Sequence, residues 1–275
     1  MYLQITNRCN MDCMHCGYSC GKHGRHMSLA TVKKAIKRMK RLDRKYGEEN
    51  AICIGGGEPT LHPDFFEILK LCMDKFSYVW MATNGSQKAT MLRLHAIIRH
   101  MDAEYFDNWR DRNIIRNKKS NLVVCLSLDK WHSDIDEDIK MLWRSQSNYN
   151  HEHRHCYELR DVGYMLSNQG RAKYYSIGTK DHKCICDALF FKANGNIHIC
   201  GCEHSPIVGT IDEGFNSYWN KARDLMDDEL DGALGTCYKT IKKNHPKFFT
   251  WLRKKDKEFR VWGDIYGRRG ATKRT

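Results

Sequence analysis

The sequence lacks the features of a membrane protein or a secreted one. None of its 275 residues lie in a stretch approaching the 18 consecutive apolar residues that a membrane-spanning helix needs. No basic region followed by an apolar run opens the chain, so we expect no signal peptide. Low-complexity linkers and internal repeats are also missing. With 41% apolar and 29% charged residues, the chain can bury a core. We expect a folded protein in the cytoplasm with no membrane partner.

Acidic residues are scarce at the C-terminal end. Residues 238–275 contain 13 Lys or Arg and 3 Asp or Glu, a net charge of +10, whereas the whole chain carries +13. Aromatic residues are interleaved with these cations, and stacking rings combined with positive charge suit a nucleic-acid strand. A solvated basic helix explains the same pattern, because charge alone does not identify a ligand.

The chain has an odd number of cysteines, 13, so they cannot all pair with one another. Reducing conditions in the cytoplasm also disfavour structural disulfides. Four of the cysteines lie within residues 9–20 and four more within residues 184–202. We therefore expect some of them to bind a metal or to take part in catalysis.

Strand patterns alternate with helix patterns through the first 180 residues. Short β-prone runs occur at 2–6, 51–60, 78–86 and 121–129, with a fifth candidate at 159–166. Amphipathic helix patterns occur between them, at 27–47, 63–76, 88–100 and 134–145. This order predicts an α/β fold with a parallel sheet and helices outside it, closed in part into a (β/α)6 TIM-type barrel.

Unusual residues follow each of the first four predicted strands. The cysteines come after the first strand, GGGEPT ends the second, TNG the third and SLD the fourth. Because the chemistry of such barrels lies at the carboxyl ends of the strands, these segments should meet at one site. Cys9, Cys13 and Cys16 have the spacing C-x3-C-x2-C, and three thiolates on one loop can wrap an iron–sulfur cube with one iron left open. A zinc-binding loop is the alternative, and it leaves the glycine and Glu-Pro segment unexplained.

The four segments together resemble the radical S-adenosylmethionine (radical SAM) superfamily, over residues 1–180. The resemblance implies that Cys9, Cys13 and Cys16 hold a catalytic [4Fe-4S] cluster and that SAM chelates its fourth iron. An electron donor of the flavodoxin or ferredoxin type would reduce the cluster. SAM would then be cleaved to methionine and a 5′-deoxyadenosyl radical, which takes a hydrogen atom from the substrate.

The resemblance also implies a SAM pocket. The backbone carbonyls of Gly56 and Gly57 and the carboxylate of Glu58 would bind the SAM amino group, a donor that needs acceptors. The remaining SAM contacts that the resemblance implies are Thr83 and Asn84 at the pocket wall, Ser127 and Asp129 near the ribose or carboxylate, and Arg171 of a GRA segment at the carboxylate. On its own, a strand-end Ser or Asp is more often a helix cap.

Three further features of the core stay open. Cys20 does not fit the cysteine spacing, so we expect a free or structural thiol. His132 follows SLD near the predicted rim, where a SAM or substrate contact and a simple helix-entry role are equally compatible. His151, His153 and His155 alternate, which would align them on a strand, but no strand pattern surrounds them and we favour a loop.

Residues 181–237 resemble the SPASM or shorter twitch extension of many radical SAM enzymes, with a hairpin pattern at NGNIHIC followed by VGTIDEG. The resemblance implies that Cys184, Cys186, Cys200 and Cys202 hold one auxiliary iron–sulfur cluster. Zinc or no metal are the alternatives, since a single intervening residue strains joint chelation of one metal. The predicted organisation is a radical SAM core at 1–180, this extension at 181–237 and a basic aromatic tail at 238–275.

The substrate does not follow from the fold, because one fold hosts many reactions. The basic aromatic tail favours a radical SAM enzyme that acts on a nucleic acid or nucleotide. The SPASM-like extension favours a peptide or protein maturase instead. A reaction on a small molecule is a further alternative. A metal-containing nucleic-acid-binding protein without enzymatic activity would leave the GGGEPT segment without a role.

Overall fold

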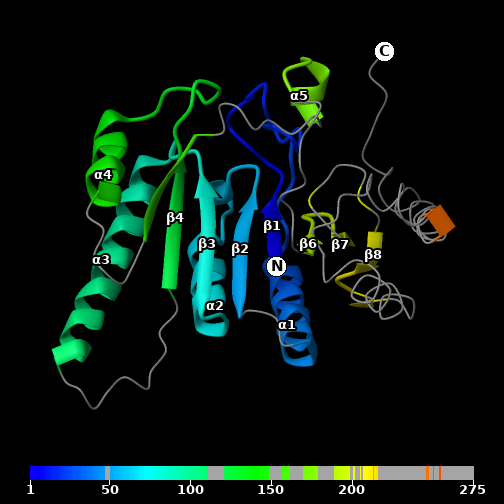
Figure 1. Cartoon of the computed structure of the whole chain (residues 1–275), viewed down its shortest axis with the longest axis horizontal. Helices are drawn as coiled ribbons and strands as arrows, with labels where there is room; N and C mark the ends of the chain where they lie inside the picture. The colour runs from blue at the N-terminus through cyan, green and yellow to red at the C-terminus, as the bar shows by residue number, and fades with distance from the viewer. Residues whose placement is uncertain are drawn as a thin grey trace. The chain divides into compact units, whose positions relative to one another are not determined.

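The structure of the chain is a computed structural model, and it contains two units that are each described by themselves (Figure 1). Unit 1 comprises Met1–His182 and Phe191–Asn194, and unit 2 comprises Lys183–Phe190 and Gly195–Thr275. The residues that the structure describes are 1–46, 50–110, 121–148, 156–161, 170–178, 189–198, 201, 205, 207–212, 214–215, 246–247, 250 and 254.

Unit 1 is built on parallel strands that pair in sequence order. Its described strands are β1 (Tyr2–Thr6), β2 (Ala51–Gly56), β3 (Tyr78–Thr83), β4 (Asn121–Ser127) and β5 (Tyr157–Arg160). Each strand is parallel to the next, so all of their carboxyl ends lie along one edge of the sheet. This arrangement confirms the predicted α/β class and its partial TIM-type barrel of parallel strands.

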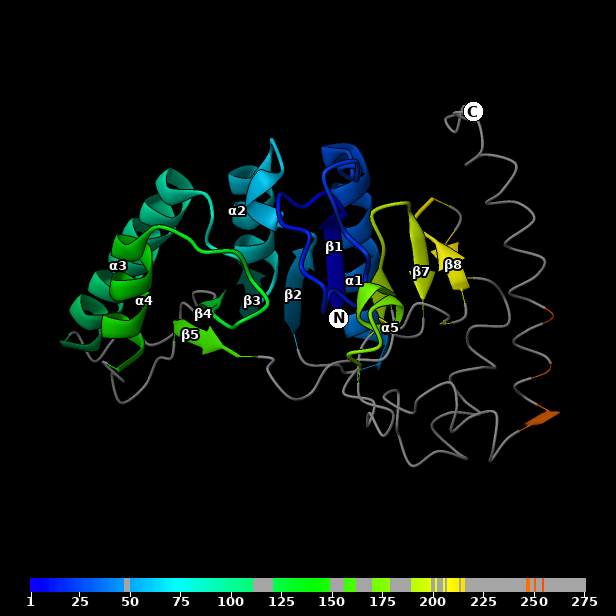
Figure 2. The same cartoon turned by 90° about the horizontal axis from the view of Figure 1, so that it is seen from above.

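Helices follow the strands of unit 1. They are α1 (Leu29–Tyr46), the 3-10 turn η1 (Pro59–Leu61), α2 (Phe65–Lys75), α3 (Lys88–Arg110), α4 (Glu137–Asn148) and the short α5 (Gly170–Tyr174). Figure 2 shows α1, α2, α3 and α4 on the same side of the strands. Their apolar sides are buried, with Val32 and Met39 of α1 and Met91 and Leu94 of α3 fully enclosed.

The core lies between these helices and the sheet. Side chains alternate along a strand, so every second residue faces the helices. On β1 to β4 these residues are aliphatic and 0–1% exposed, namely Leu3, Ile5, Ile52, Ile54, Val79, Met81, Leu122, Val124 and Leu126. Enclosing each side chain of this kind stabilises the fold by about 1.5–3 kcal/mol. The other face of the sheet carries polar and aromatic residues, which become important below.

Helix α3 and strand β5 are among the elements whose bounds differ from the sequence prediction. Helix α3 extends to residue 110 rather than 100, and its apolar pattern continues with Met101, which is 8% exposed. Strand β5 begins at Tyr157, two residues earlier than predicted. The Tyr157 hydroxyl lies 2.7 Å from His95 Nδ1, and its ring packs edge-on against Trp143. The strand therefore starts where its first residue can pack against α3 and α4.

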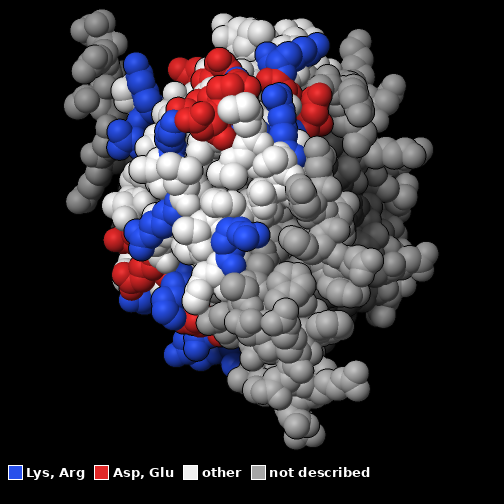
Figure 3. Space-filling view, turned by 90° about the vertical axis from the view of Figure 1, so that its left-hand side faces the viewer, with Lys and Arg blue, Asp and Glu red and all other residues white. Residues whose placement is uncertain are grey.

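Charged residues join α3 to the start of α4. Figure 3 views the left-hand side of Figure 1, and Asp and Glu side chains gather at the top of that face with Lys and Arg beside them. Lys88 bridges Asp136 and Asp138 over 2.9 and 2.6 Å. Such exposed pairs each contribute less than about 1 kcal/mol. They fix the loop between β4 and α4, which carries part of the candidate site.

Unit 2 contains short antiparallel strands. Strand β7 (Asn196–His198) pairs with β8 (Ile207–Thr210), and β8 pairs with β9 (Gly214–Phe215). The expected turn before the NIH strand is confirmed. Strand β6 (Phe190–Phe191) lies where the two units divide. The domain boundaries at 180 and 237, and the SPASM or twitch character of this region, stay predictions.

Within the described residues, no helix combines the length and the apolar character that crossing a membrane requires.

Candidate functional site

Cys9, Cys13 and Cys16 lie on the loop that follows β1. The loop is shaped by backbone hydrogen bonds from Cys9 N–H to Gly21 O (3.0 Å) and from Cys16 N–H to Cys13 O (3.2 Å). All three thiols are free and partly buried. Burial raises the pKa of Cys13 to about 11, and the nearby Cys9 and Cys16 thiols add to the rise. Thiolates that repel one another in this way suit bound iron, whose positive charge offsets the repulsion.

Cys20 lies beneath this loop and is 3% exposed. It is a free thiol, as expected, and its Sγ is 3.6 Å from the carbonyl oxygen of Gly56. A hydrogen bond from the Cys20 thiol lowers the pKa of Cys16 to about 6, and the same contact raises the pKa of Cys20. The spacing of the cysteines gave no indication of this contact with a predicted cluster ligand.

Arg171, at the start of α5, binds the cysteine loop through hydrogen bonds to its backbone carbonyls. Its Nε donates to Cys13 O over 2.8 Å, its Nη1 to Cys20 O over 2.7 Å, and its backbone N–H to Cys16 O over 3.0 Å. Nη1 also lies 3.4 Å from an Asp12 carboxylate oxygen. The predicted contact of Arg171 with the SAM carboxylate stays a prediction. Its hydrogen bonds to three loop carbonyls were not foreseen.

The glycines after β2 allow this strand to approach the cysteine loop closely. A Cβ at Gly56 would lie 1.8 Å from Thr6 O, and one at Gly57 would lie 2.1 Å from Arg8 O. Gly56 also has a φ of +150°, which side chains disfavour. The backbone N–H groups of Gly57 and Glu58 donate to the same two carbonyls, over 2.8 and 2.9 Å. The GGE segment therefore extends the pairing of β2 with β1 into residues 6–8, where the cysteine loop begins.

The Glu58 carboxylate joins the ends of β2 and β3. It is 1% exposed and accepts hydrogen bonds from Thr60 N–H (3.1 Å), Thr60 Oγ1 (2.5 Å), Thr83 Oγ1 (2.7 Å) and Asn84 N–H (2.7 Å). Burial raises the pKa of Glu58, and these donors oppose the rise. Since three of the four bonds go to Oε1, Oε2 keeps acceptor capacity for an ammonium group. The predicted role of Glu58 at the SAM amino group stays a prediction that this geometry permits.

Asn84 links the end of β3 to the cysteine loop. Its Nδ2 lies 3.1 Å from Asn10 Oδ1 and 3.9 Å from the sulfur of Cys9, and Asn10 Nδ2 donates to Ser86 Oγ over 2.8 Å. A polar side chain in contact with a cluster thiolate can tune its electronics. The structure thus brings Thr83 and Asn84 beside Glu58 and Cys9, at the edge where both were expected.

Asp129 and its neighbours form the fourth side of the site. Ser127 is the last residue of β4 and is 9% exposed. The Asp129 carboxylate accepts from Trp131 N–H (2.9 Å) and His132 Nδ1 (2.8 Å). Burial tends to raise the pKa of Asp129, but the hydrogen bond and charge of His132, together with the Trp131 N–H, outweigh it, so the net shift is downward. His132 is therefore part of the site through Asp129.

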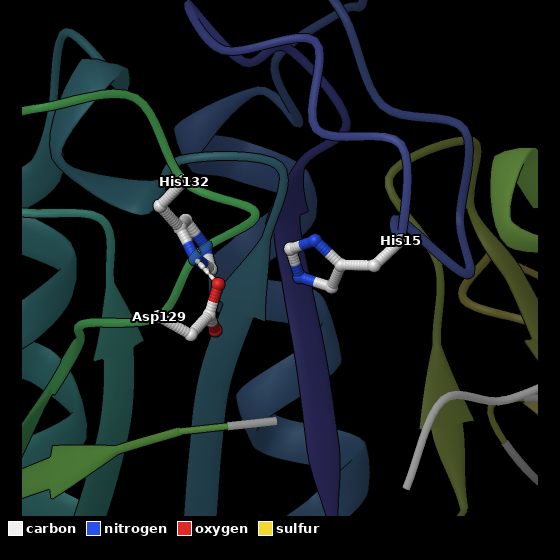
Figure 4. A group of neighbouring side chains, drawn as sticks. All are labelled: His15, Asp129 and His132. Carbon is white, nitrogen blue, oxygen red and sulfur yellow. Dashed lines mark hydrogen bonds and ion pairs between the residues drawn. The ribbon is translucent and has the colours of Figure 1, made fainter. Parts of the chain in front are cut away.

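His15 completes a group with Asp129 and His132 whose ligand atoms all lie within 4.8 Å of one another (Figure 4). Burial lowers the pKa of His15 to about 4, and the neighbouring His132 adds to the shift. In the described part of the chain, the buried atoms His15 Nδ1 and Trp131 Nε1 have no hydrogen-bond partner. Buried polar atoms of this kind usually bind a partner. A polar heterocycle such as the adenine of SAM would supply both a donor and an acceptor there. Sequence reasoning did not single out Trp131.

Several predicted site residues lie outside the residues that the structure describes. They are the rear cysteines Cys184, Cys186, Cys200 and Cys202 and the alternating histidines His151, His153 and His155. Their predicted roles in an auxiliary cluster and in a loop, respectively, stay predictions. Eight of the front residues are joined by the contacts given above, namely Cys9, Cys13, Cys16, Gly56, Gly57, Glu58, Thr83 and Asn84, whereas Asp129 lies beside His15 and His132.

Comparison with known proteins identifies the front part of the chain. A family model described as the radical SAM superfamily matches residues 3–142. A 7,8-dihydro-6-hydroxymethylpterin dimethyltransferase of Methanocaldococcus jannaschii is 36% identical over 86 residues, covering 30% of this chain and 16% of the relative. Mycofactocin maturase MftC of Mycobacterium tuberculosis is 35% identical over 83 residues, covering 30% of this chain and 20% of the relative.

A third relative is an S-adenosylmethionine-dependent nucleotide dehydratase of Selenomonas ruminantium, 34% identical over 84 residues, with 30% of this chain and 29% of the relative covered. The matched stretch therefore spans less than a third of the length of each of these three relatives. Among solved structures, BtrN in complex with AdoMet and 2-DOIA has a TM-score of 0.54 at 15% identity, covering 86% of this chain and 91% of BtrN. This likeness concerns the fold.

Proposed function

Because the chain belongs to the radical SAM superfamily, we propose that it is an enzyme that binds a [4Fe-4S] cluster through Cys9, Cys13 and Cys16 and cleaves SAM reductively. When bound, the cluster and SAM, which are the cofactors of this family, supply a 5′-deoxyadenosyl radical that removes a hydrogen atom from the substrate. The observation that carries the proposal is the cysteine loop itself, which the ends of β2 and β3 hold through Gly57, Glu58 and Asn84.

The protein's own groups would position both cofactors. The three thiols hold the irons, and Cys20, Asn84 and Arg171 brace the loop that carries them. Oε2 of Glu58 accepts the SAM ammonium group, and the backbone carbonyls of the glycines before it can accept as well. Ring nitrogens of His15 and Trp131, which have no partner among the described residues, would bind the adenine, and Asp129 beside His15 would bind the ribose.

The test is anaerobic reconstitution with iron and sulfide, followed by reduction with dithionite in the presence of SAM. We expect about four irons per chain for one cluster, or about eight if the rear cysteines hold an auxiliary cluster. We also expect formation of 5′-deoxyadenosine. Cys13→Ala should abolish it, because two remaining thiolates cannot hold the cluster in place.

The matched control is Cys72→Ala, which removes a buried thiol of α2 away from the loop. This variant should retain the iron content and the SAM cleavage of the wild type. If Cys13→Ala still forms 5′-deoxyadenosine at the wild-type rate, the proposed cluster assignment is wrong.

The substrate that we propose is a nucleotide or a nucleic acid. The basic aromatic residues 238–275 support it, and one relative is named as a nucleotide dehydratase. The second candidate is a peptide or protein, supported by the similarity to a mycofactocin maturase. A flavodoxin- or ferredoxin-type electron donor and a cytoplasmic location are parts of the same proposal. Mass analysis of reaction mixtures that contain either a nucleotide or a peptide would show which class is modified.

A further inference from the structure

The face of the unit 1 sheet opposite α1, α2, α3 and α4 carries side chains that the proposed cluster and SAM sites do not use. Alternation along the strands places Tyr78 and Trp80 of β3 and Glu158 and Arg160 of β5 on this face, opposite the aliphatic residues that contact the helices. In a closed barrel the same positions are filled by branched aliphatic side chains. Partly exposed aromatic rings and charged groups of this kind are common in ligand sites.

The side chain of Trp80 extends across the sheet toward β5. Its Nε1 donates to Glu158 Oε2 over 2.7 Å, although β4 separates β3 from β5. Neighbouring strands are about 4.8 Å apart, so the indole must extend across β4 to reach the carboxylate. Val123, the register partner of Trp80 on β4, is 1% exposed, as expected beneath such a ring. Trp80 is partly exposed, so part of the indole is accessible to a planar ligand.

Arg160 places a positive charge on the same face of the sheet, two residues beyond Glu158 on β5. Its side chain is exposed, and it makes no ion pair or hydrogen bond with any part of the chain that the structure describes. Its guanidinium, at the end of β5, is therefore available to an anion.

We propose that this face binds the substrate and that the substrate is a nucleotide, whose base stacks on Trp80 and whose phosphate binds Arg160. The inference rests on the proposed function, since it names the substrate of the same enzyme. Aromatic rings stack on any base, and a carboxylate such as Glu158 accepts from an exocyclic amine. Glu158 and Arg160 are two residues apart on one strand, roughly 7 Å, a span that a base and its phosphate can bridge with the long arginine side chain.

The charge balance of the face favours a nucleotide over a cationic peptide. Glu158 already accepts from Trp80, whereas the side chain of Arg160 has no partner among the residues that the structure describes. The ligand that completes the face therefore carries an anion next to a planar ring. The SAM carboxylate is a second source of an anion, and an acidic peptide is a third, so the experiment must separate them.

The experiment is anaerobic calorimetry on the cluster-loaded full chain with SAM present and no reductant. The probes are the four ribonucleoside 5′-monophosphates, the matching nucleosides and a short acidic peptide. We expect a monophosphate to bind about 10- to 100-fold more tightly than its nucleoside, the contribution of a charge-assisted hydrogen bond. Arg160→Gln should remove that difference. Trp80→Leu should weaken the nucleoside and the monophosphate alike, by about tenfold.

The matched control is Arg99→Gln, an exposed arginine on α3 that should leave all affinities unchanged. Equal affinity for nucleoside and monophosphate overturns the inference, as does binding of the acidic peptide alone. It is also overturned if Arg160→Gln weakens SAM binding and leaves the monophosphate unaffected. Formation of 5′-deoxyadenosine by the same wild-type sample is measured separately. If it forms while no nucleotide binds, this inference fails and the proposed function stands.

Discussion

At the scale of single residues, the candidate site depends on hydrogen bonds that residue spacing does not indicate. Cys20 is four residues beyond Cys16 and does not fit the ligand motif, yet its thiol lowers the pKa of Cys16 to about 6. His132 binds Asp129, and His15 faces both (Figure 4). Each of these residues affects the chemistry of a predicted ligand without being a predicted ligand itself.

Cys20→Ala should raise the pKa of Cys16 in the cluster-free chain from about 6 toward the ordinary 9.0. The reason is the loss of the thiol hydrogen bond that stabilises the Cys16 thiolate. The pH dependence of Cys16 alkylation, followed by mass spectrometry, measures this shift. In the loaded protein, loss of a donor to a cluster sulfur should also make the reduction potential more negative. Cys72→Ala should change neither quantity, and an unchanged Cys16 pKa in Cys20→Ala would contradict the assignment.

His15 should make the fold less stable as the pH falls. Burial and His132 lower its pKa to about 4 from 6.5, so between these values the unfolded chain binds more protons than the folded chain. Stability is then complete above pH 6.5 and decreases toward pH 4. Because the ring is partly exposed, solvent screening reduces the effect to the order of 1 kcal/mol. Urea unfolding of the cluster-free chain at pH 7 and pH 5 measures it. The His15→Phe variant should lose less unfolding free energy between pH 7 and pH 5 than the wild type. An equal loss in both proteins would show that His15 is not the cause.

At the scale of elements, the site is a set of connections between strand ends. The β2 end pairs with the entry to the cysteine loop through Gly57, the β3 end holds Glu58, and α5 grips the loop through Arg171. These connections explain why the four sequence segments act as one site although up to 120 residues separate them. The short helix α5 is the element whose contribution the sequence did not reveal.

Arg171→Ala should weaken retention of the cluster about 10- to 100-fold, the usual effect of losing a group that positions metal ligands. The substitution removes the side-chain hydrogen bonds to the carbonyls of Cys13 and Cys20 and leaves the backbone bond to Cys16. The rate of iron loss to a chelator measures the effect. Lys173→Ala, an exposed residue of the same helix, is the control. Equal rates for the two variants would show that Arg171 does not hold the loop.

At the scale of the whole molecule, the sequence predicted the fold better than it predicted the details of the site. Regular alternation of strands and helices gave the parallel sheet, because burial of residues such as Leu3, Ile54 and Met81 is periodic along the chain. The spacing of Cys9, Cys13 and Cys16 predicted the cysteine loop, because these three residues are close together in the sequence. Arg171 contacts Cys13 although 158 positions separate them in the sequence, and Trp80 contacts Glu158 although 78 positions separate them. No local sequence pattern encodes either contact.

The C-terminal tail provides a further prediction at this scale. Deleting residues 238–275 removes a net charge of +10 and should reduce the affinity for single-stranded nucleic acid. The dependence of affinity on salt should also become shallower, because fewer counterions are released on binding. Fluorescence anisotropy with a labelled oligonucleotide, measured at about 50 and about 200 mM salt, reports both the affinity and its salt dependence. Unchanged affinity and salt slope after the deletion would exclude the tail as a binding element.

The hydrogen bonds around the cysteine loop have a consequence for assembly of the holoprotein. Since Gly21, Arg8 and Arg171 already fix the loop backbone, most of its conformational entropy is lost when the chain folds and not when iron arrives. Preorganised ligands bind more tightly because binding has less ordering to oppose it. The amides of Cys9 and Cys16 should accordingly be protected from hydrogen exchange in the apoprotein, whereas a loop ordered only by its cluster would exchange freely until loaded.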